Sequence, residues 1–248
     1  MYRGGVDNAF FGVLRECADE IGSAIVNHRG RGYSGQRPSQ YHLDVVADEV
    51  AVRVLRAAGL RIVSEESGVT GAGEWTVVVD PIDGSTNCDR GIPFYATSFA
   101  LLRGEELVAG LVKNQATGTV YEAEKGSGAF RNGEAIHAGD ISQITAAIIS
   151  FSGRPDRHLG WAQHRSLGAA SLEICLVADG SLDAFAVAQQ SALHPWDYLG
   201  ALIISREAGA VAGDYFGDDL ETSAFIERHP VVAGTRELLD AMIDAGPL

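Results

Sequence analysis

One stretch, residues 75–87, constrains the fold and the chemistry of this chain more than any other. Its valines, Val77 to Val79, have the β-branched composition of a short buried strand. Proline removes a backbone donor directly after Asp80, so regular strand pairing is expected to stop there. Asp80 and Asp83 then lie three residues apart around a turn. Burying two carboxylates costs free energy unless something positive neutralises them, and a divalent cation is the simplest candidate.

The residues that follow this turn suit a phosphate group. Gly84 allows a ligand to approach the backbone closely, and Ser85, Thr86 or Asn87 can cap a following helix. Free amides at the start of a helix bind anions. The turn is therefore predicted to hold metal on its acidic side and phosphate on its amide side.

The charge balance limits the class of partner. The 248 residues include 19 basic and 33 acidic side chains, a formal net charge of −14. Such a surface repels nucleic acid, so no polynucleotide partner is expected. It also repels a phosphorylated metabolite unless bound cations reverse the sign locally, although most of the acids need only keep the protein soluble.

The sequence contains no signal for a membrane or an oxidising compartment. No apolar run approaches the length that spans a bilayer, and the first residues lack the apolar region of a secretory signal. The cysteines are far apart and odd in number, which suits reduced thiols better than disulfides or a zinc site. We expect a cytoplasmic protein without membrane contact.

Two amphipathic helices are predicted before the acidic turn. Apolar residues recur at helical spacing over residues 7–28 and 44–58, and Gly59 is a plausible stop for the second helix. Residues 29–40, between the helices, are rich in glycine, arginine and serine, which indicates an exposed loop. Its arginines, Arg37 among them, are either solvated or form an anion-binding flap beside the acidic turn.

Strands dominate the chain after the turn, and helices return in its second half. A loop is predicted over 88–95, and a hairpin at Asn132-Gly133. The other expected strands are 96–102, 107–113, 119–123, 146–151, 181–187 and 231–233, and the expected helices are 165–180, 196–209 and 235–244. This mixture indicates a layered α/β or α+β architecture. Because no phosphate-binding glycine pattern follows a strand, nucleotide kinases and Rossmann dehydrogenases are not expected.

Three motifs occur in a specific order along the chain. They are Ser64-Glu-Glu-Ser67, Asp80-Pro-Ile-Asp-Gly-Ser-Thr-Asn87 and Pro195-Trp-Asp197. Together they resemble the GEES, DPIDGTTN and WD motifs of the inositol monophosphatase family, which are metal-dependent, lithium-sensitive sugar-phosphate phosphatases. The resemblance runs from about Asp44 to the C-terminus. It implies an α+β fold, a layered αβαβα sandwich of the inositol monophosphatase and fructose-1,6-bisphosphatase type, with subdomains 1–144 and 145–248.

The resemblance also implies a metal site built only from oxygen donors: Glu65, Asp80, the Ile82 carbonyl, Asp83 and Asp197. Hard oxygen ligands suit two or three Mg²⁺ ions, with Mn²⁺ as a substitute, better than zinc. The implied reaction is in-line hydrolysis of a phosphate monoester, with Asp48 and Ser85 orienting water and Glu66 supporting the metal ligands. Counting back from the first motif favours Asp48 over Asp44 for this role.

The resemblance places the substrate against five residues: Arg37, Gly84, Ser85, Ala170 and Gln190. Gln190 stands where inositol-specific members have a glutamate, and Arg37 replaces their loop lysine. The expected substrate is an inositol monophosphate-like metabolite, with histidinol phosphate, fructose 1,6-bisphosphate and 3′-phosphoadenosine phosphate as open alternatives. A non-catalytic metal- or phosphate-binding module is disfavoured because the carboxylates are intact. The family also implies a homodimer.

Overall fold

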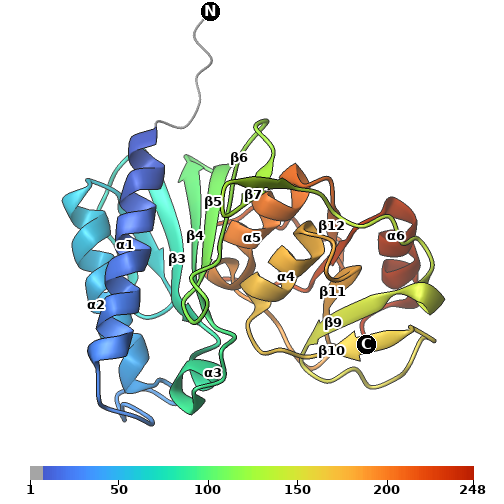
Figure 1. The fold of residues 1–248 in the computed structure, drawn as a ribbon, viewed down its shortest axis with the longest axis horizontal. Coiled ribbons are helices and arrows are strands. Elements are labelled where there is room, and N and C mark those ends of the chain that lie inside the picture. Colours follow the sequence, from blue (N-terminus) through green and yellow to red (C-terminus); the bar gives the residue numbers. More distant parts are fainter. Residues whose placement is uncertain (1–7) are drawn as a thin grey trace, which may run out of the picture.

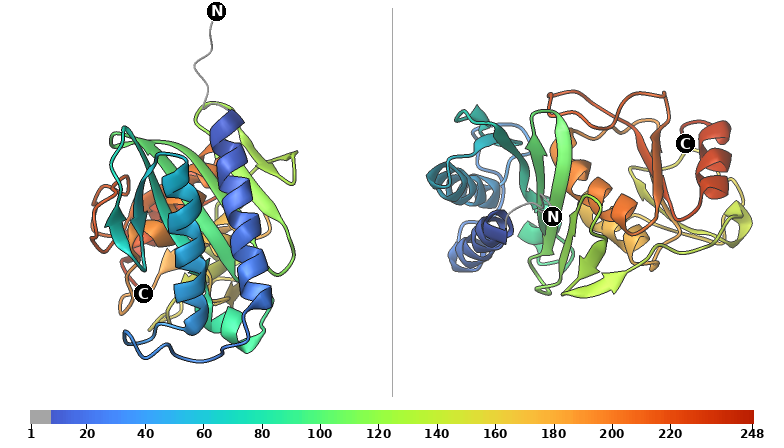
Figure 2. Two further views of the ribbon diagram at one scale, coloured as in Figure 1. Left: turned by 90° about the vertical axis from the view of Figure 1, so that its left-hand side faces the viewer. Right: turned by 90° about the horizontal axis from the view of Figure 1, so that it is seen from above.

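The helices and strands of this protein form five layers. A computed structural model describes residues 8–248, and Figure 1 shows the layers side by side: two helices, a large sheet, two helices, a smaller sheet and one helix. The view from above in Figure 2 has the same order. The α+β sandwich predicted from the sequence is confirmed.

The first layer consists of helices α1 (Asn8–Asn27) and α2 (His42–Ala57), which lie side by side against the large sheet (Figure 2). Each buries the apolar stripe that predicted it, for example Leu14 and Ile21 on α1. Both helices match their expected ranges closely, although Asp7, the predicted start of α1, lies outside the described residues. The 29–40 loop joins them.

The large sheet has eight strands in the order β2-β1-β3-β4-β5-β6-β7-β8. Their bounds are β1 (Arg61–Ser64), β2 (Gly68–Thr70), β3 (Trp75–Asp83), β4 (Ala96–Arg103), β5 (Glu106–Asn114), β6 (Val120–Glu124), β7 (Ala129–Arg131) and β8 (Glu134–Ile136). Only β1 and β3 are parallel among these neighbours, and the short strand β2 was not predicted.

A short helix, α3 (Ser85–Arg90), follows β3 where a loop had been expected from residue 88. It begins after Gly84, whose backbone is left-handed with φ of 84°, and ends at Gly91, with φ of 73°. The two glycines let the chain enter and leave one and a half turns of helix without steric strain.

The middle layer holds α4 (Ala170–Ala178) and α5 (Pro195–Glu207) between the two sheets. Both helices are buried on nearly all sides, as expected for a layer covered on both faces. The prediction that the first of them begins at Arg165 was wrong, because residues 163–165 pair in parallel with β9 as strand β10.

The smaller sheet has the order β10-β9-β11-β13-β12, and α6 (Arg236–Ala245) covers its outer face. Its strands are β9 (Ile148–Ser152), β10 (Gln163–Arg165), β11 (Ala184–Val187), β12 (Val211–Asp214) and β13 (Pro230–Ala233), and a 3₁₀ turn, Ile144–Ala146, precedes β9. The subdomain boundary expected at 144/145 lies in the connection between the sheets and remains a prediction. Among residues 8–248, no helix is long and apolar enough to cross a membrane.

The contact between α5 and the large sheet is unusually close at Gly200. A Cβ atom there would lie 2.5 Å from the Phe99 carbonyl oxygen and 2.9 Å from the Ser98 hydroxyl. Backbone cannot move aside as a flexible side chain can, so glycine is required at this position. This contact fixes the helix that carries Asp197.

We expect Gly200→Ala to lower the free energy of unfolding by about 1–3 kcal/mol, because the added methyl group forces α5 away from β4. Gly12→Ala is the matched control: Gly12 is also helical, but a Cβ there meets nothing within 4 Å. That control should gain about 0.5–1 kcal/mol. Urea unfolding of the two variants measures both changes, and equal effects would contradict the packing described here.

Candidate active site

The parallel pair β1 and β3 brings the motifs at residues 64–67 and 80–87 together at one edge of the large sheet. Ser64 on β1 lies beside Val79 on β3, so Glu65, directly after β1, comes level with Asp80 in β3. The Glu65 amide donates to the Val79 carbonyl at 3.4 Å. Because parallel strands end at the same edge, acids distant in sequence become neighbours.

Five acidic side chains gather at this edge, where the large sheet meets the middle helices. Asp80 and Asp83 are 2% and 6% exposed, and Asp197 comes from the first turn of α5. Burial raises the pKa of Asp80 and of Asp197 well above the usual range, and the charges of Glu65 and Asp83 raise both further. Removal from bulk water raises the pKa of Glu65 to about 7, with Asp44 as the next contribution.

Asp83 is held by donors from the second half of the chain. Its carboxylate accepts the Ala170 amide at 3.1 Å and both the amide and the hydroxyl of Ser171, at 2.7 and 2.5 Å. Asp83 thus caps the first turn of α4 from another part of the chain. Burial nevertheless raises the pKa of Asp83 to about 6, against the effect of these hydrogen bonds.

The Ala170 contact adds a role to one of the predicted substrate residues. Its amide has Asp83 as its partner and so helps to hold this carboxylate. The contact of Ala170 with the substrate stays a prediction. Glycine at position 84 was expected to let a ligand approach the backbone. The structure adds a second reason, because a Cβ there would lie 2.8 Å from the Gly168 carbonyl oxygen. It is the protein's own loop that approaches Gly84, in addition to any ligand.

Asp44 and Asp48 occupy successive turns on the same buried face of α2, and only Asp44 lines the cavity. The Asp44 Oδ2 accepts the Tyr41 amide at 2.7 Å, while its Oδ1 is buried without a hydrogen-bond partner in the described chain. Burial raises the pKa of Asp44 to about 6. The preference for Asp48 over Asp44 is therefore not supported by the geometry.

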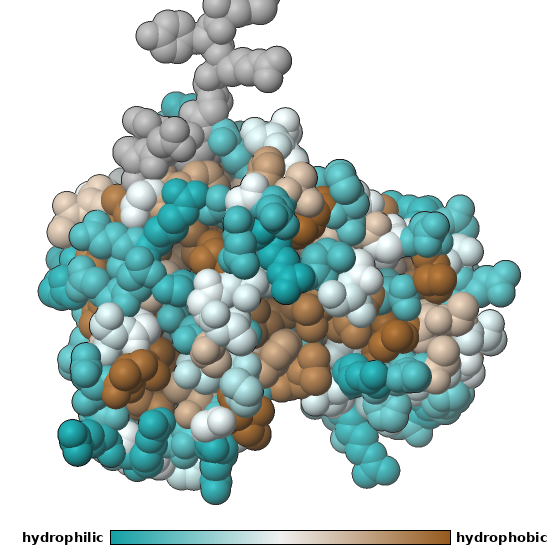
Figure 3. Space-filling view, in the orientation of Figure 1, coloured by the Kyte–Doolittle hydropathy of each residue, from teal (hydrophilic) through white to brown (hydrophobic). Residues whose placement is uncertain are grey.

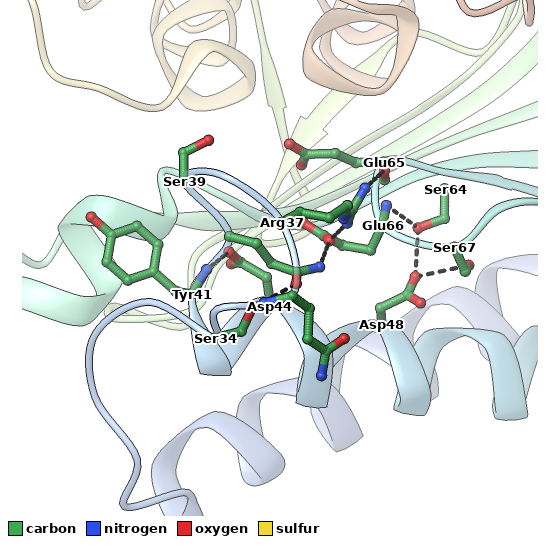
Figure 4. Close-up of polar contacts among 12 residues, drawn as sticks. Ser34, Arg37, Ser39, Tyr41, Asp44, Asp48, Ser64, Glu65, Glu66 and Ser67 are labelled. Carbon is green, nitrogen blue, oxygen red and sulfur yellow. Dashed lines mark hydrogen bonds and ion pairs between the residues drawn. The ribbon is translucent and has the colours of Figure 1, made fainter.

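Asp48 instead supports the turn that carries the glutamates. Its Oδ1 accepts the hydroxyls of Ser64 and Ser67 at 2.6 and 3.1 Å, and Figure 4 shows it turned away from Asp44 toward these serines. Burial raises the pKa of Asp48, and the two hydroxyl donors oppose this. Asp48 thus positions residues 64–67, and its Oδ1 is occupied by two hydroxyl donors.

A cavity of about 370 Å³ opens above the acids. It is lined by part of the 29–40 loop, by the glutamate turn and by the start of α3: Arg37, Pro38, Ser39, Gln40, Asp44, Glu65, Glu66, Ser85 and Thr86. Four of the predicted site residues, Arg37, Glu65, Glu66 and Ser85, are among them. The loop is thus placed where an anion-binding flap would need to be.

Arg37 is tied to the wall of this cavity. Its guanidinium forms an ion pair with Glu66 and donates to the Glu65 carbonyl at 3.5 Å (Figure 4). The Gln40 side-chain amide donates to the same Glu66 oxygen. Glu66 therefore anchors the loop. Gln190 lies exposed after β11 and does not line the cavity.

The donor chemistry of this edge fits a divalent cation. All the gathered groups offer oxygen, Asp44 has a buried acceptor without a partner among the described residues, and burial, followed by the neighbouring acids, raises the pKa of Asp80. Within the described residues, no three acidic, histidine or cysteine side chains are already arranged as a closed metal-binding group.

A model of the inositol monophosphatase family matches residues 40–245. The chain belongs to the inositol monophosphatase family. Members are in general metal-dependent, and this chain is a phosphoric monoester hydrolase. The match begins a few residues before Asp44 and covers both sheets, in agreement with the extent of the motif resemblance.

Relatives match this family member along nearly its whole length. A fructose-1,6-bisphosphatase/inositol-1-monophosphatase of Methanocaldococcus jannaschii is 34% identical over 247 residues, which cover 93% of this chain and 96% of that protein. An inositol-1-monophosphatase of Rhizobium meliloti is 30% identical, with 95% of each chain covered. The solved structure of an extragenic suppressor from Pyrococcus furiosus superposes with a TM-score of 0.83 at 29% identity, covering 95% of this chain and 99% of that one.

One buried acid of this phosphatase was not found by sequence reasoning. Glu173 on α4 is 1% exposed and accepts the Leu167 amide at 2.8 Å and the Ser150 hydroxyl. It therefore fixes the 167–169 loop, which contacts Gly84. A lone acid within the apolar run Leu172-Glu-Ile-Cys-Leu-Val177 was the available signal.

We expect Glu173→Gln to stabilise the protein at high pH only. Burial raises the pKa of Glu173 to about 7, so the neutral acid contributes stability below its unfolded pKa near 4.5, and this is lost as the pH rises through 7. Glutamine stays neutral and keeps the acceptor. Its advantage should be absent at pH 4 and on the order of 2 kcal/mol at pH 8.

The measurement is urea unfolding of wild type and Glu173→Gln across this pH range. Glu237→Gln, an exposed acid on α6, controls for the loss of one negative charge. A difference between wild type and Glu173→Gln that does not change with pH would contradict the assignment.

The roles of Asp44 and Asp48 can be distinguished by measuring phosphate release and stability of their variants. Asp44→Asn should lower the rate of phosphate release by about 10²–10⁴-fold, because it removes a carboxylate from the cavity. Asp48→Asn, the matched control one turn away, should lower stability more than the rate. Phosphate release at saturating Mg²⁺ measures the first effect and thermal unfolding the second. The opposite order of rates would restore Asp48 to the catalytic role.

Proposed function

We propose that this protein is a Mg²⁺-dependent phosphomonoesterase for a small phosphorylated metabolite of the inositol monophosphate type. The observation that carries the proposal is the meeting of Glu65, Asp80, Asp83 and Asp197 from three separate elements beside a cavity. So much negative charge at a buried edge is expected where a cation is bound.

The metal ligands in this proposal are Glu65, Asp80, the Ile82 carbonyl, Asp83 and Asp197, holding two or three Mg²⁺ with Mn²⁺ as a substitute. Hard oxygen donors favour these cations. When bound, Mg²⁺ would supply Lewis acidity toward water and phosphate oxygens. Ser171 leaves the Asp83 carboxylate little freedom to rotate, because it donates two hydrogen bonds to one oxygen. That restraint orients the other oxygen.

Asp44 is proposed to orient the attacking water and to accept its proton, in place of Asp48. Asp44 lines the cavity, and its buried Oδ1 has no hydrogen-bond partner among the described residues. Burial raises its pKa to about 6, which suits a group that takes up a proton near neutral pH. Ser85 lines the same cavity and is proposed to share the water through its hydroxyl. The amides of Gly84 and Ser85 are proposed to bind phosphate oxygens.

Arg37 is proposed to meet the substrate from the 29–40 loop. It lines the cavity, and its ion pair with Glu66 holds the guanidinium over the phosphate side. Glu66 is proposed to act through Arg37 and Gln40. Gln190 remains a proposed contact for a substrate hydroxyl, since an uncharged amide in place of an acid is compatible with several sugars.

Fructose 1,6-bisphosphate is a second candidate substrate. The Methanocaldococcus jannaschii relative is named for both activities, and a solved structure described as an inositol monophosphatase–fructose 1,6-bisphosphatase superposes with a TM-score of 0.82 at 32% identity. Histidinol phosphate and 3′-phosphoadenosine phosphate stay open as alternatives. The homodimer and the cytoplasmic location remain predictions.

We expect the purified protein to release phosphate from inositol 1-phosphate with Mg²⁺ and not after chelation. Asp83→Asn should abolish both phosphate release and Mg²⁺ binding, because the amide group has a weaker oxygen ligand and no charge. Asp140→Asn, an exposed control, should change neither. A colorimetric assay measures phosphate release from inositol 1-phosphate, fructose 1,6-bisphosphate, histidinol phosphate and 3′-phosphoadenosine phosphate. Calorimetric titration measures Mg²⁺ binding. Undiminished turnover by Asp83→Asn would contradict the mechanism.

A further inference from the structure

Two polar side chains lie beneath the acidic turn and take no part in the site described above. Thr97 on β4 is fully buried, and its hydroxyl donates to the Pro81 carbonyl at 2.9 Å. Gln115 follows β5, and its side-chain Nε2 donates to Thr97 Oγ1 and to the Ala18 carbonyl, each at 2.8 Å. A chain of hydrogen bonds thus runs from α1 to the turn.

The turn needs such a donor because the ladder between β3 and β4 is irregular there. Asp80 pairs with Ser98 and Asp83 pairs with Ala96, so three residue steps on β3 face two on β4. This is a β-bulge, which interrupts regular hydrogen bonding. A buried carbonyl without a donor is costly, and the Thr97 hydroxyl supplies one to Pro81.

The donor and acceptor of each hydrogen bond between Ala18, Gln115, Thr97 and Pro81 follow from the chemistry of these groups. The Ala18 carbonyl can only accept, so the nitrogen of the Gln115 amide must face it. The second N–H of that amide then points to Thr97 Oγ1, which leaves the single hydroxyl proton for Pro81. The three groups therefore have one mutually consistent arrangement.

The peptide between Pro81 and Ile82 is consequently held at both ends. The Thr97 hydroxyl donates to the Pro81 carbonyl, and the Ile82 N–H donates to Asp80 Oδ1 at 3.0 Å. Because a peptide is planar, two such contacts fix its orientation and also the rotation of the Asp80 carboxylate. The same plane contains the Ile82 Cα, so the backbone atom that carries the Ile82 carbonyl is placed by it as well.

We propose that Thr97 and Gln115 are positioning residues that orient the Pro81–Ile82 peptide, and through it the Asp80 carboxylate, for cation binding. The inference rests on the proposed function, in which this turn holds a divalent cation. Partners one shell behind metal ligands commonly change affinity by 10- to 100-fold when removed. Neither residue touches the cavity.

Gly22 on α1 leaves the space that the Gln115 side-chain amide occupies. Alanine usually stabilises a helix interior relative to glycine. A Cβ at Gly22 would, however, lie 2.5 Å from Gln115 Oε1 and displace the side-chain amide. The glycine leaves room for the amide in the position that serves both Ala18 and Thr97.

The test is calorimetric titration of the full chain with Mn²⁺. Thr97→Val removes the hydroxyl at nearly constant volume and should weaken Mn²⁺ binding about tenfold. Thr97→Ser keeps the donor and should bind as wild type does. Thr76→Val is the matched control, because Thr76 is also a buried threonine of this sheet, near the opposite end of β3. Equal affinities for Thr97→Val and Thr97→Ser would overturn the proposal.

A second variant and a metal-free measurement guard against misfolding. Gln115→Met has similar length without the amide donors and should weaken Mn²⁺ binding in the same direction. In the metal-free protein, deuterium exchange over residues 80–84 should be faster in either variant than in Thr97→Ser; unchanged exchange would contradict the positioning role. Wild type that binds no Mn²⁺ would instead contradict the proposed function, whatever the exchange rates.

Discussion

The burial of several carboxylates beside one another is the constraint on which the rest of this structure depends. Asp80, Asp83 and Asp197 are brought to one edge of a sheet, with Glu65 and Asp44 beside them, and burial alone would disfavour each charge. Of the described residues that line the cavity, only Arg37 carries a guanidinium. Such an arrangement is unfavourable for stability by itself and is understandable as a site that a cation completes.

The way the two halves of the chain meet follows from the same constraint. Asp83 caps α4 from the first half, and Gly84 admits the Gly168 carbonyl at a distance that excludes any side chain. Glu173 then holds the 167–169 loop from within α4. The phosphate side of the site is therefore part of the contact between the two halves of the chain. The 29–40 loop forms the polar wall of the cavity separately.

In the space-filling view of Figure 3, polar residues cover most of the face, while apolar residues gather where the two halves of the molecule join.

The layered fold and the acidic edge were predictable from the sequence because they depend on local signals. Alternating and helical apolar spacing predicted most elements, whereas the parallel pairing of β1 with β3 is seen only in the structure. What the sequence does not determine depends on tertiary distance. Asp44 and Asp48 differ by one helical turn, and counting along a loop cannot decide which of them reaches a cavity. Residues 163–165 carry helix-compatible side chains but pair with β9, and the Ala170 amide meets Asp83 across 87 positions of sequence.

The central claim is that the acidic edge between the large sheet and α5 binds divalent cations. Crystals grown with Mn²⁺ and inorganic phosphate, measured at the manganese absorption edge, test it directly. The account predicts anomalous peaks among Asp80, Asp83 and Asp197, with the phosphate density beside Ser85. Anomalous peaks only at other positions, at a Mn²⁺ concentration that supports turnover, would contradict it.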